Sequence, residues 1–165
     1  MSERAYLENP DAAAAYELAY REGVRALSEQ QIVTDSFRTR AGLLLSGAAI
    51  ATSFLGQAAL DRGITAFTWL AIAAFVALGG AVLGILWPRR DWEYAMRPEL
   101  LIENYIEHPE PLPMPQIHRD LALHMDRSYL QNRGQLLRLT WLFRLASILL
   151  VVEVVAWVVD LLVQS

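Results

Sequence analysis

The chain has 165 residues, of which 55% are hydrophobic and 19% are charged, and its formal net charge at pH 7 is −4. This length predicts one compact unit, because two ordinary domains need more residues. The acidic balance argues against nucleic acid as a partner, which a basic surface would attract. The absence of cysteine excludes disulfides, thiol catalysis and cysteine-bound metal.

Residues 1–40 predict a long cytoplasmic helix that faces water. Asn9 is a favourable N-cap, Pro10 suits the first helical turn, and no proline follows before Arg40. One face of this helix carries an apolar stripe, formed by Tyr16, Tyr20, Val24 and Leu27. Because no helix breaker comes next, we expect the helix to continue into the membrane.

Residues 41–87 predict a transmembrane helical hairpin. Asp61 and Arg62 are the only charged residues in this stretch. The apolar runs on either side of them are each about twenty residues long, enough to cross a hydrocarbon core of about 30 Å. Gly63, directly after the charged pair, suits a tight turn. The sequence therefore predicts two membrane spans joined by a short loop.

Small residues recur at helical spacing in both halves of this hairpin. In lipid, small side chains let helix backbones approach closely, which takes the place of the hydrophobic driving force. Two interpretations remain open: the small residues pack the hairpin against itself, or they form the interface of a homo-oligomer. The residues expected to make these contacts are Gly42, Ser46, Ser53, Gly56, Gly80 and Gly84.

Residues 88–140 predict cytoplasmic helices. Prolines alternate with other residues in the segment 108–115, which is typical of an extended polyproline II strut. From Gln116 no proline interrupts the chain, and apolar residues return at helical spacing. We therefore expect one helix to run from this point towards the C-terminus.

Residues 141–165 predict a third transmembrane helix. Trp141 is expected to lie at the membrane interface, where this helix enters the bilayer. Arginines near the predicted spans gather on one side, with Arg62 alone on the other. The positive-inside rule then places the N-terminus in the cytoplasm and the C-terminus outside. The expected fold class is an all-α integral protein of the inner membrane, with three transmembrane helices and long cytoplasmic helical extensions.

Glu153, Trp157 and Asp160 form a candidate polar stripe on one face of the third predicted span. A carboxylate inside a membrane helix costs a few kcal/mol unless it has a partner, water or a proton. In a ring of identical helices, the stripe is expected to line a lumen that favours cations. The alternative is that Glu153 is protonated or has a hydrogen-bond partner in its own chain. The candidate partners are Thr52, Ser53 and Gln57.

No sequence pattern typical of catalysis is present. The chain lacks GxSxG, HExxH, a P-loop and a glycine-rich dinucleotide loop. Asp120 and His124 lie one helical turn apart, but a single pair of this kind is more typical of a surface than of a metal centre. We therefore expect no catalytic, cofactor or metal site, and a protein that is not an enzyme.

The segment from Arg38 to Gly56, RTRAGLLLSGAAIATSFLG, follows a long predicted helix. This arrangement resembles the small helical membrane effector domains of bacterial antiphage systems, of the Pycsar transmembrane and SLATT-like types, over roughly residues 10–90. The resemblance implies that a nucleotide second messenger, sensed by a partner or an attached domain, triggers membrane damage. The third span and the lack of a cyclic-nucleotide-binding domain depart from that pattern, so sensing would fall to another protein or to the short cytoplasmic helices.

Two classes of function are compatible with these features. The first is a membrane-perturbing or pore-forming effector that acts on the lipid bilayer as an oligomer in antiphage defence. The second is a non-catalytic membrane scaffold subunit that binds a cytoplasmic protein through its helical extensions. Carboxylates that face a shared axis favour the effector, whereas carboxylates buried within one chain favour the scaffold.

Overall fold

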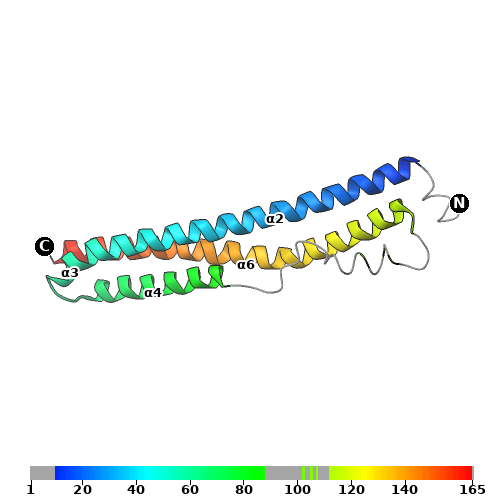
Figure 1. Ribbon diagram of the computed structural model, residues 1–165. Coiled ribbons are helices and arrows are strands. Elements are labelled where there is room, and N and C mark those ends of the chain that lie inside the picture. The colour runs from blue at the N-terminus through cyan, green and yellow to red at the C-terminus, as the bar shows by residue number, and fades with distance from the viewer. Residues whose placement is uncertain (1–9, 88–101, 103–104, 106, 108–111, 165) are drawn as a thin grey trace. The chain divides into compact units, whose positions relative to one another are not determined.

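A computed structural model of the protein describes residues 10–87, 102, 105, 107 and 112–164 (Figure 1). The elements of regular structure in these residues are all helical: α2 (Pro10–Ala51), η1 (Thr52–Gly56), α3 (Gln57–Leu60), α4 (Ala66–Leu86) and α6 (Met114–Val163). Three helical stretches are long and apolar enough to cross a membrane, namely Asp11–Leu60, Ala66–Leu86 and Met114–Val163. The predicted all-α class with three candidate spans is confirmed.

The chain forms two compact units instead of the single unit that its length predicts. The polar unit comprises Met1–Val33 and Arg90–Leu136, and the apolar unit comprises Thr34–Arg89 and Leu137–Ser165. Helices α2 and α6, of 42 and 50 residues, each contribute to both units. At 1.5 Å per residue, α2 is roughly two times and α6 roughly two and a half times as long as the hydrocarbon core of a bilayer is thick. Only part of each helix can therefore lie in lipid.

The polar unit is held by the predicted apolar stripe of α2. Leu27 on α2 and Leu121 and Met125 on α6 are buried, so each of the two helices encloses an apolar face in this unit. Val24 was expected on the same face but is 43% exposed. Val24 departs from the buried face because each residue of a helix turns by about 100°, so positions four apart drift around its axis.

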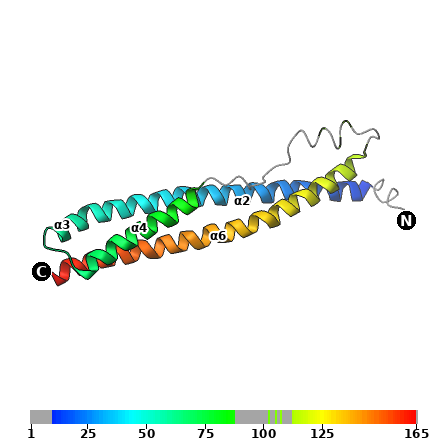
Figure 2. The same ribbon diagram turned by 90° about the horizontal axis from the view of Figure 1, so that it is seen from below.

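Contacts within the polar unit show that α2 and α6 run in the same direction there. The ring of Tyr20 stacks on that of His118 with 5.4 Å between the ring centroids. Further along both helices, Gln30 Nε2 donates a hydrogen bond to the carbonyl oxygen of Tyr129 at 3.2 Å. Later residues of α2 thus meet later residues of α6, as Figure 1 and Figure 2 also show.

The predicted N-cap Asn9 and residues 108–111 of the predicted proline strut lie outside the described residues. Leu112 and Pro113 are non-helical, but α6 begins at Met114, so the strut is shorter than expected. Pro115 is tolerated in the first turn because N–H groups there have no acceptor inside the helix. The carbonyl oxygen of Pro113 accepts hydrogen bonds from the first backbone N–H groups that follow.

The apolar unit is a bundle of three helices. The end of α2 with η1 and α3 runs parallel to the last part of α6, and α4 runs in the opposite direction (Figure 2). Ala59, Ala71, Ala156 and Trp157 form a buried cluster where the three meet. The outer flanks are apolar and exposed, as at Phe54, which is 75% exposed. A bundle with this surface is suited to lipid.

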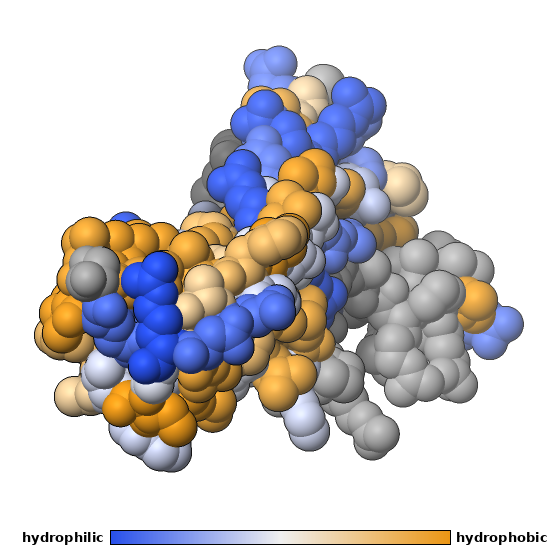
Figure 3. Space-filling model, turned by 90° about the vertical axis from the view of Figure 1, so that its left-hand side faces the viewer, coloured by the Kyte–Doolittle hydropathy of each residue, from blue (hydrophilic) through white to orange (hydrophobic). Residues whose placement is uncertain are grey.

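The predicted hairpin turn is present between α3 and α4. The N–H groups of Asp61 and Arg62 donate to carbonyl oxygens of the last turn of α3. Gly63 has a φ of +132°, a conformation that residues with side chains rarely adopt. Figure 3 views this end of the apolar unit, where hydrophilic groups gather at the tip and hydrophobic groups cover the flanks.

A π-helical segment, η1, interrupts the first span, and no sequence pattern predicted it. Ala41 and Ala48 are buried seven positions apart, and the next position at that spacing is Leu55. The π turn inserts one extra residue, so Gly56 takes the enclosed position instead.

We predict that Gly23→Leu weakens the polar unit. A Cβ atom at Gly23 would lie 3.2 Å from the Cβ and Sδ atoms of Met125, whereas a Cβ atom at Gly134 would meet nothing within 4 Å. Overpacking should lower the free energy of unfolding of Gly23→Leu by about 1–3 kcal/mol relative to Gly134→Leu. Unfolding in mixed detergent micelles, followed by circular dichroism, measures the difference. Equal stabilities would contradict the packing of this contact.

Candidate functional site

Glu153 lies on α6 opposite the π segment and is completely buried. Its Oε1 atom accepts a hydrogen bond from the Thr52 hydroxyl at 2.5 Å. Its Oε2 atom has no hydrogen-bond partner among the described residues. Of the candidate partners from the sequence, Thr52 makes the contact, while Ser53 donates to the carbonyl oxygen of Ala49. The carboxyl group is thus enclosed by its own chain, with one oxygen left over.

Trp157 completes this contact one helical turn further along α6. Its indole Nε1 donates to the Thr52 hydroxyl at 3.3 Å, so the hydroxyl links the indole to the Glu153 carboxyl group. The ring also covers Gly56, where a Cβ atom would lie only 3.2 Å from the Trp157 Cζ2 atom. Thr52 and Gly56 are four residues apart on η1. Thr52 supplies a hydroxyl group to Glu153 and Trp157, and Gly56 leaves space for the Trp157 ring.

Asp160 is also completely buried, but it is fully supplied with donors. The Thr65 hydroxyl donates to Oδ1, the Thr68 hydroxyl donates to Oδ2 at 2.8 Å, and Gln164 Nε2 donates to Oδ1 at 3.1 Å. Hydrogen bonds to an ionised acceptor are stronger than those between neutral groups. The site of Asp160 is therefore built for a carboxylate.

The two threonines connect Asp160 to the N-terminus of α4. The Thr65 hydroxyl accepts from the N–H of Phe67 at 3.0 Å, and the Thr68 hydroxyl accepts from the N–H of Thr65 at 2.9 Å. These N–H groups belong to the first turn of the helix, where no carbonyl is available to them. The carboxylate thus lies at the positive end of the α4 dipole, which stabilises a negative charge.

The tip of the hairpin is tied to the end of α6 by further polar contacts. Arg62 Nη1 donates to the carbonyl oxygen of Leu161 at 3.2 Å. Gln164 Nε2 donates to the carbonyl oxygen of Gly63 at 3.0 Å. Together with the hydrogen bonds to Asp160, these contacts hold the end of α6 against the hairpin turn. We call this group of contacts the clasp.

The six small residues singled out from the sequence fall into two groups. Gly56 faces Trp157, and a Cβ atom at Gly84 would lie 3.4 Å from Leu142 Cδ1, so both lie at helix contacts within the chain. The other four meet no neighbouring helix in this way: Gly42 and Gly80 have open space where a Cβ atom would be, and Ser46 and Ser53 are exposed. An interface between copies of the chain at those four residues stays a prediction.

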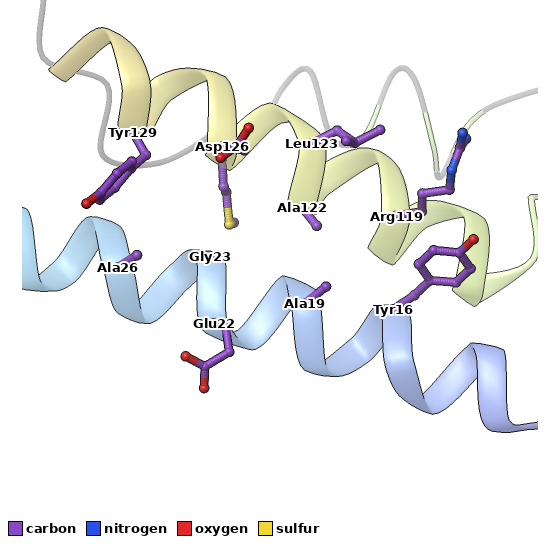
Figure 4. Close-up of a pocket in the computed structure, with 11 residues that line it drawn as sticks. Tyr16, Ala19, Glu22, Gly23, Ala26, Arg119, Ala122, Leu123, Asp126 and Tyr129 are labelled. Carbon is purple, nitrogen blue, oxygen red and sulfur yellow. The ribbon is translucent and has the colours of Figure 1, made fainter. Parts of the chain in front are cut away.

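A groove of about 540 Å³ lies between α2 and α6 in the polar unit (Figure 4). Small side chains line it, with Tyr16 near one end and Tyr129 at the other. The apolar stripe of Tyr16, Tyr20, Val24 and Leu27 did not predict this groove, because the stripe contains only large side chains. The signal was present in a second row of small residues on α2, at Ala19, Gly23 and Ala26.

No group of three or more His, Cys, Asp or Glu side chains that could hold a metal occurs within the described part of the chain. Asp120 does not pair with His124; it forms an ion pair with Arg119 at 3.6 Å. Burial, and secondly the negative charge of Asp120, raise the pKa of the Tyr105 hydroxyl. The described residues of the polar unit thus line a groove and contain no such cluster that could hold a metal.

Comparisons with family models, curated proteins and solved structures found no match for this chain. The resemblance to antiphage membrane effectors therefore stays a prediction, and the function must be argued from the residues themselves.

We predict that Thr68→Val destabilises the apolar unit, because it removes a donor to the buried Asp160 carboxylate and leaves the shape almost unchanged. The expected cost is about 1–2 kcal/mol. Thr39→Val is the matched control, since the exposed Thr39 hydroxyl only donates to a carbonyl oxygen of its own helix, at 3.0 Å. Both variants are compared by unfolding in mixed micelles. A control as unstable as Thr68→Val would show that the carboxylate contact is not the cause.

We also predict different outcomes for the same substitution at two glycines. Gly56→Leu should displace Trp157 and lower the free energy of unfolding by about 1–3 kcal/mol. Gly80→Leu should leave that free energy unchanged, because the site is open. Size-exclusion chromatography of both variants reports their assembly. Normal stability of Gly56→Leu would refute the packing of the indole ring on η1.

Proposed function

We propose that this chain is a non-catalytic membrane scaffold subunit. In this proposal the apolar unit anchors it in the inner membrane, and the polar unit binds a helical segment of a cytoplasmic protein. One observation carries the choice between the two functions: Glu153 and Asp160 are completely buried among helices of their own chain. A cation-favouring lumen requires carboxylates that are open to a shared axis.

The apolar unit supports the role of an anchor. Its exposed flanks carry large apolar side chains such as Leu43, Phe54 and Val76. Among the polar side chains within its apolar stretches, Glu153 is turned inward and Ser46 donates to a carbonyl oxygen of its own helix. This distribution suits a surface surrounded by lipid, because hydrocarbon offers no hydrogen bonds.

The groove of the polar unit supports the binding of a helix. Along α2 it extends from Tyr16 to Ala26, which is about 15 Å or three helical turns. Small side chains on its floor allow a third helix to approach closely, and an apolar helix face is the usual ligand of such a groove. Glu22 and Asp126 line it with negative charge, and Arg119 carries the positive charge. We therefore propose a partner helix with an apolar face flanked by basic residues.

A photo-crosslinking amino acid at Ala19 tests this proposal, with Ser28 as the matched control on the opposite side of α2. The full chain in its native membrane should form one adduct with a single protein from Ala19 and none from Ser28. Ala122→Trp, which fills the groove, should abolish that adduct. An adduct within the chain itself, or no adduct, would contradict the proposal.

The same cells distinguish a scaffold from an effector. A scaffold leaves the membrane potential equal to that of cells without the protein. Depolarisation that disappears in Glu153→Gln, at wild-type amounts of protein in the membrane, would overturn the scaffold and favour the pore-forming effector.

A further inference from the structure

We propose that Glu153 is a proton-binding site, held as a neutral carboxylic acid at pH 7 between α6 and η1. Its side chain is completely buried, and Oε1 faces the Thr52 hydroxyl at 2.5 Å. Oε2 has no hydrogen-bond partner among the described residues. This inference does not depend on the scaffold proposal, because it rests on the apolar unit alone.

The elements packed around Glu153 bring no positive charge to it. Helix α4 contains no ionisable residue, and neither do residues 41–60 of α2, η1 and α3. The only other ionisable residue of α6 beyond Arg144 is Asp160, which has the same sign of charge. Among the described residues, the charged ones that flank these elements are Arg40, Asp61, Arg62, Arg144 and Asp160. Arg40, Arg62 and Arg144 are exposed.

The two buried carboxyl groups therefore have opposite requirements. Asp160 receives three side-chain hydrogen bonds and lies at the N-terminus of α4, so its negative charge is compensated. Glu153 receives one hydrogen bond and no compensating charge. An uncompensated charge inside a membrane helix is costly, and binding a proton removes it.

A proton fits this site better than a metal cation. A hard cation needs several oxygen ligands, whereas the side chains around Glu153 offer one hydroxyl group, from Thr52. The protonated carboxyl group has an O–H donor of its own. It can therefore donate a hydrogen bond to the Thr52 hydroxyl as well as accept one from it. Trp157 Nε1 already donates to the same hydroxyl, which completes the contact.

Infrared spectroscopy of the full chain in lipid nanodiscs tests the proposal directly. At pH 7 the wild type should show the carbonyl-stretching band of one protonated carboxyl group. Glu153→Gln should lack this band, and Asp160→Asn should keep it. Absence of the band from the wild type overturns the proposal whether or not the variants fold. A band that is lost in Asp160→Asn and kept in Glu153→Gln overturns it as well.

Stability against pH gives a second readout. If the folded form keeps a proton that the unfolded form has released, stability falls as pH rises. The unfolding equilibrium constant of the wild type should then increase by up to tenfold per pH unit relative to Glu153→Gln, until Glu153 ionises in the folded protein. If the ratio of the two unfolding equilibrium constants, wild type over Glu153→Gln, does not change between pH 6 and 9, the proposal is overturned.

Discussion

Hydrocarbon cannot form hydrogen bonds, and in the proposed membrane setting the internal arrangement of the apolar unit depends on this constraint. Apolar side chains alone give α6 little reason to prefer one register against the hairpin, because lipid is as apolar as the helix contacts. Polar pairs supply that preference. Thr52 contacts Glu153 at one turn of α6, and the hydrogen bonds to Asp160 fix a second position nearer the end of that helix. A shift of α6 by one residue would separate both sets of partners and leave them in an apolar surrounding.

The same constraint explains why the carboxyl groups do not resemble each other. Asp160 lies where α4 begins. Backbone N–H groups there donate to the Thr65 and Thr68 hydroxyls, and these hydroxyls in turn donate to the Asp160 carboxylate. Glu153 lies beside a continuing helix, where the backbone has no donors to spare. The π segment provides a hydroxyl group at Thr52 and space for the Trp157 ring at Gly56, but it brings no positive charge to Glu153. The environment of each acid thus follows from which part of the neighbouring helix it meets.

Much of the fold was predictable because it depends on local properties. The length and hydrophobicity of each apolar run predict a span, and the absence of proline predicts that α2 and α6 continue beyond it. The partner of Glu153 was narrowed to three neighbours on one span, and the choice of Thr52 needed the π segment, which has no pattern of its own. Likewise, spacing grouped the small residues, but only the structure separates Gly56, which faces an indole ring, from Gly80, which faces no side chain.

The groove of the polar unit follows from a difference in the number of helices. In the apolar unit α4 is the third helix, and the side chains of all three enclose a buried cluster. Among its described residues, the polar unit has only two long helices, the first parts of α2 and α6. Two helices can bury one seam between them, but they cannot surround a core, so among the described residues a groove lined by Ala19, Gly23 and Ala26 lies along that seam. Where such a groove faces water it attracts apolar surface, and the proposed third helix from a partner would give the polar unit the three-helix architecture that α4 gives the apolar unit.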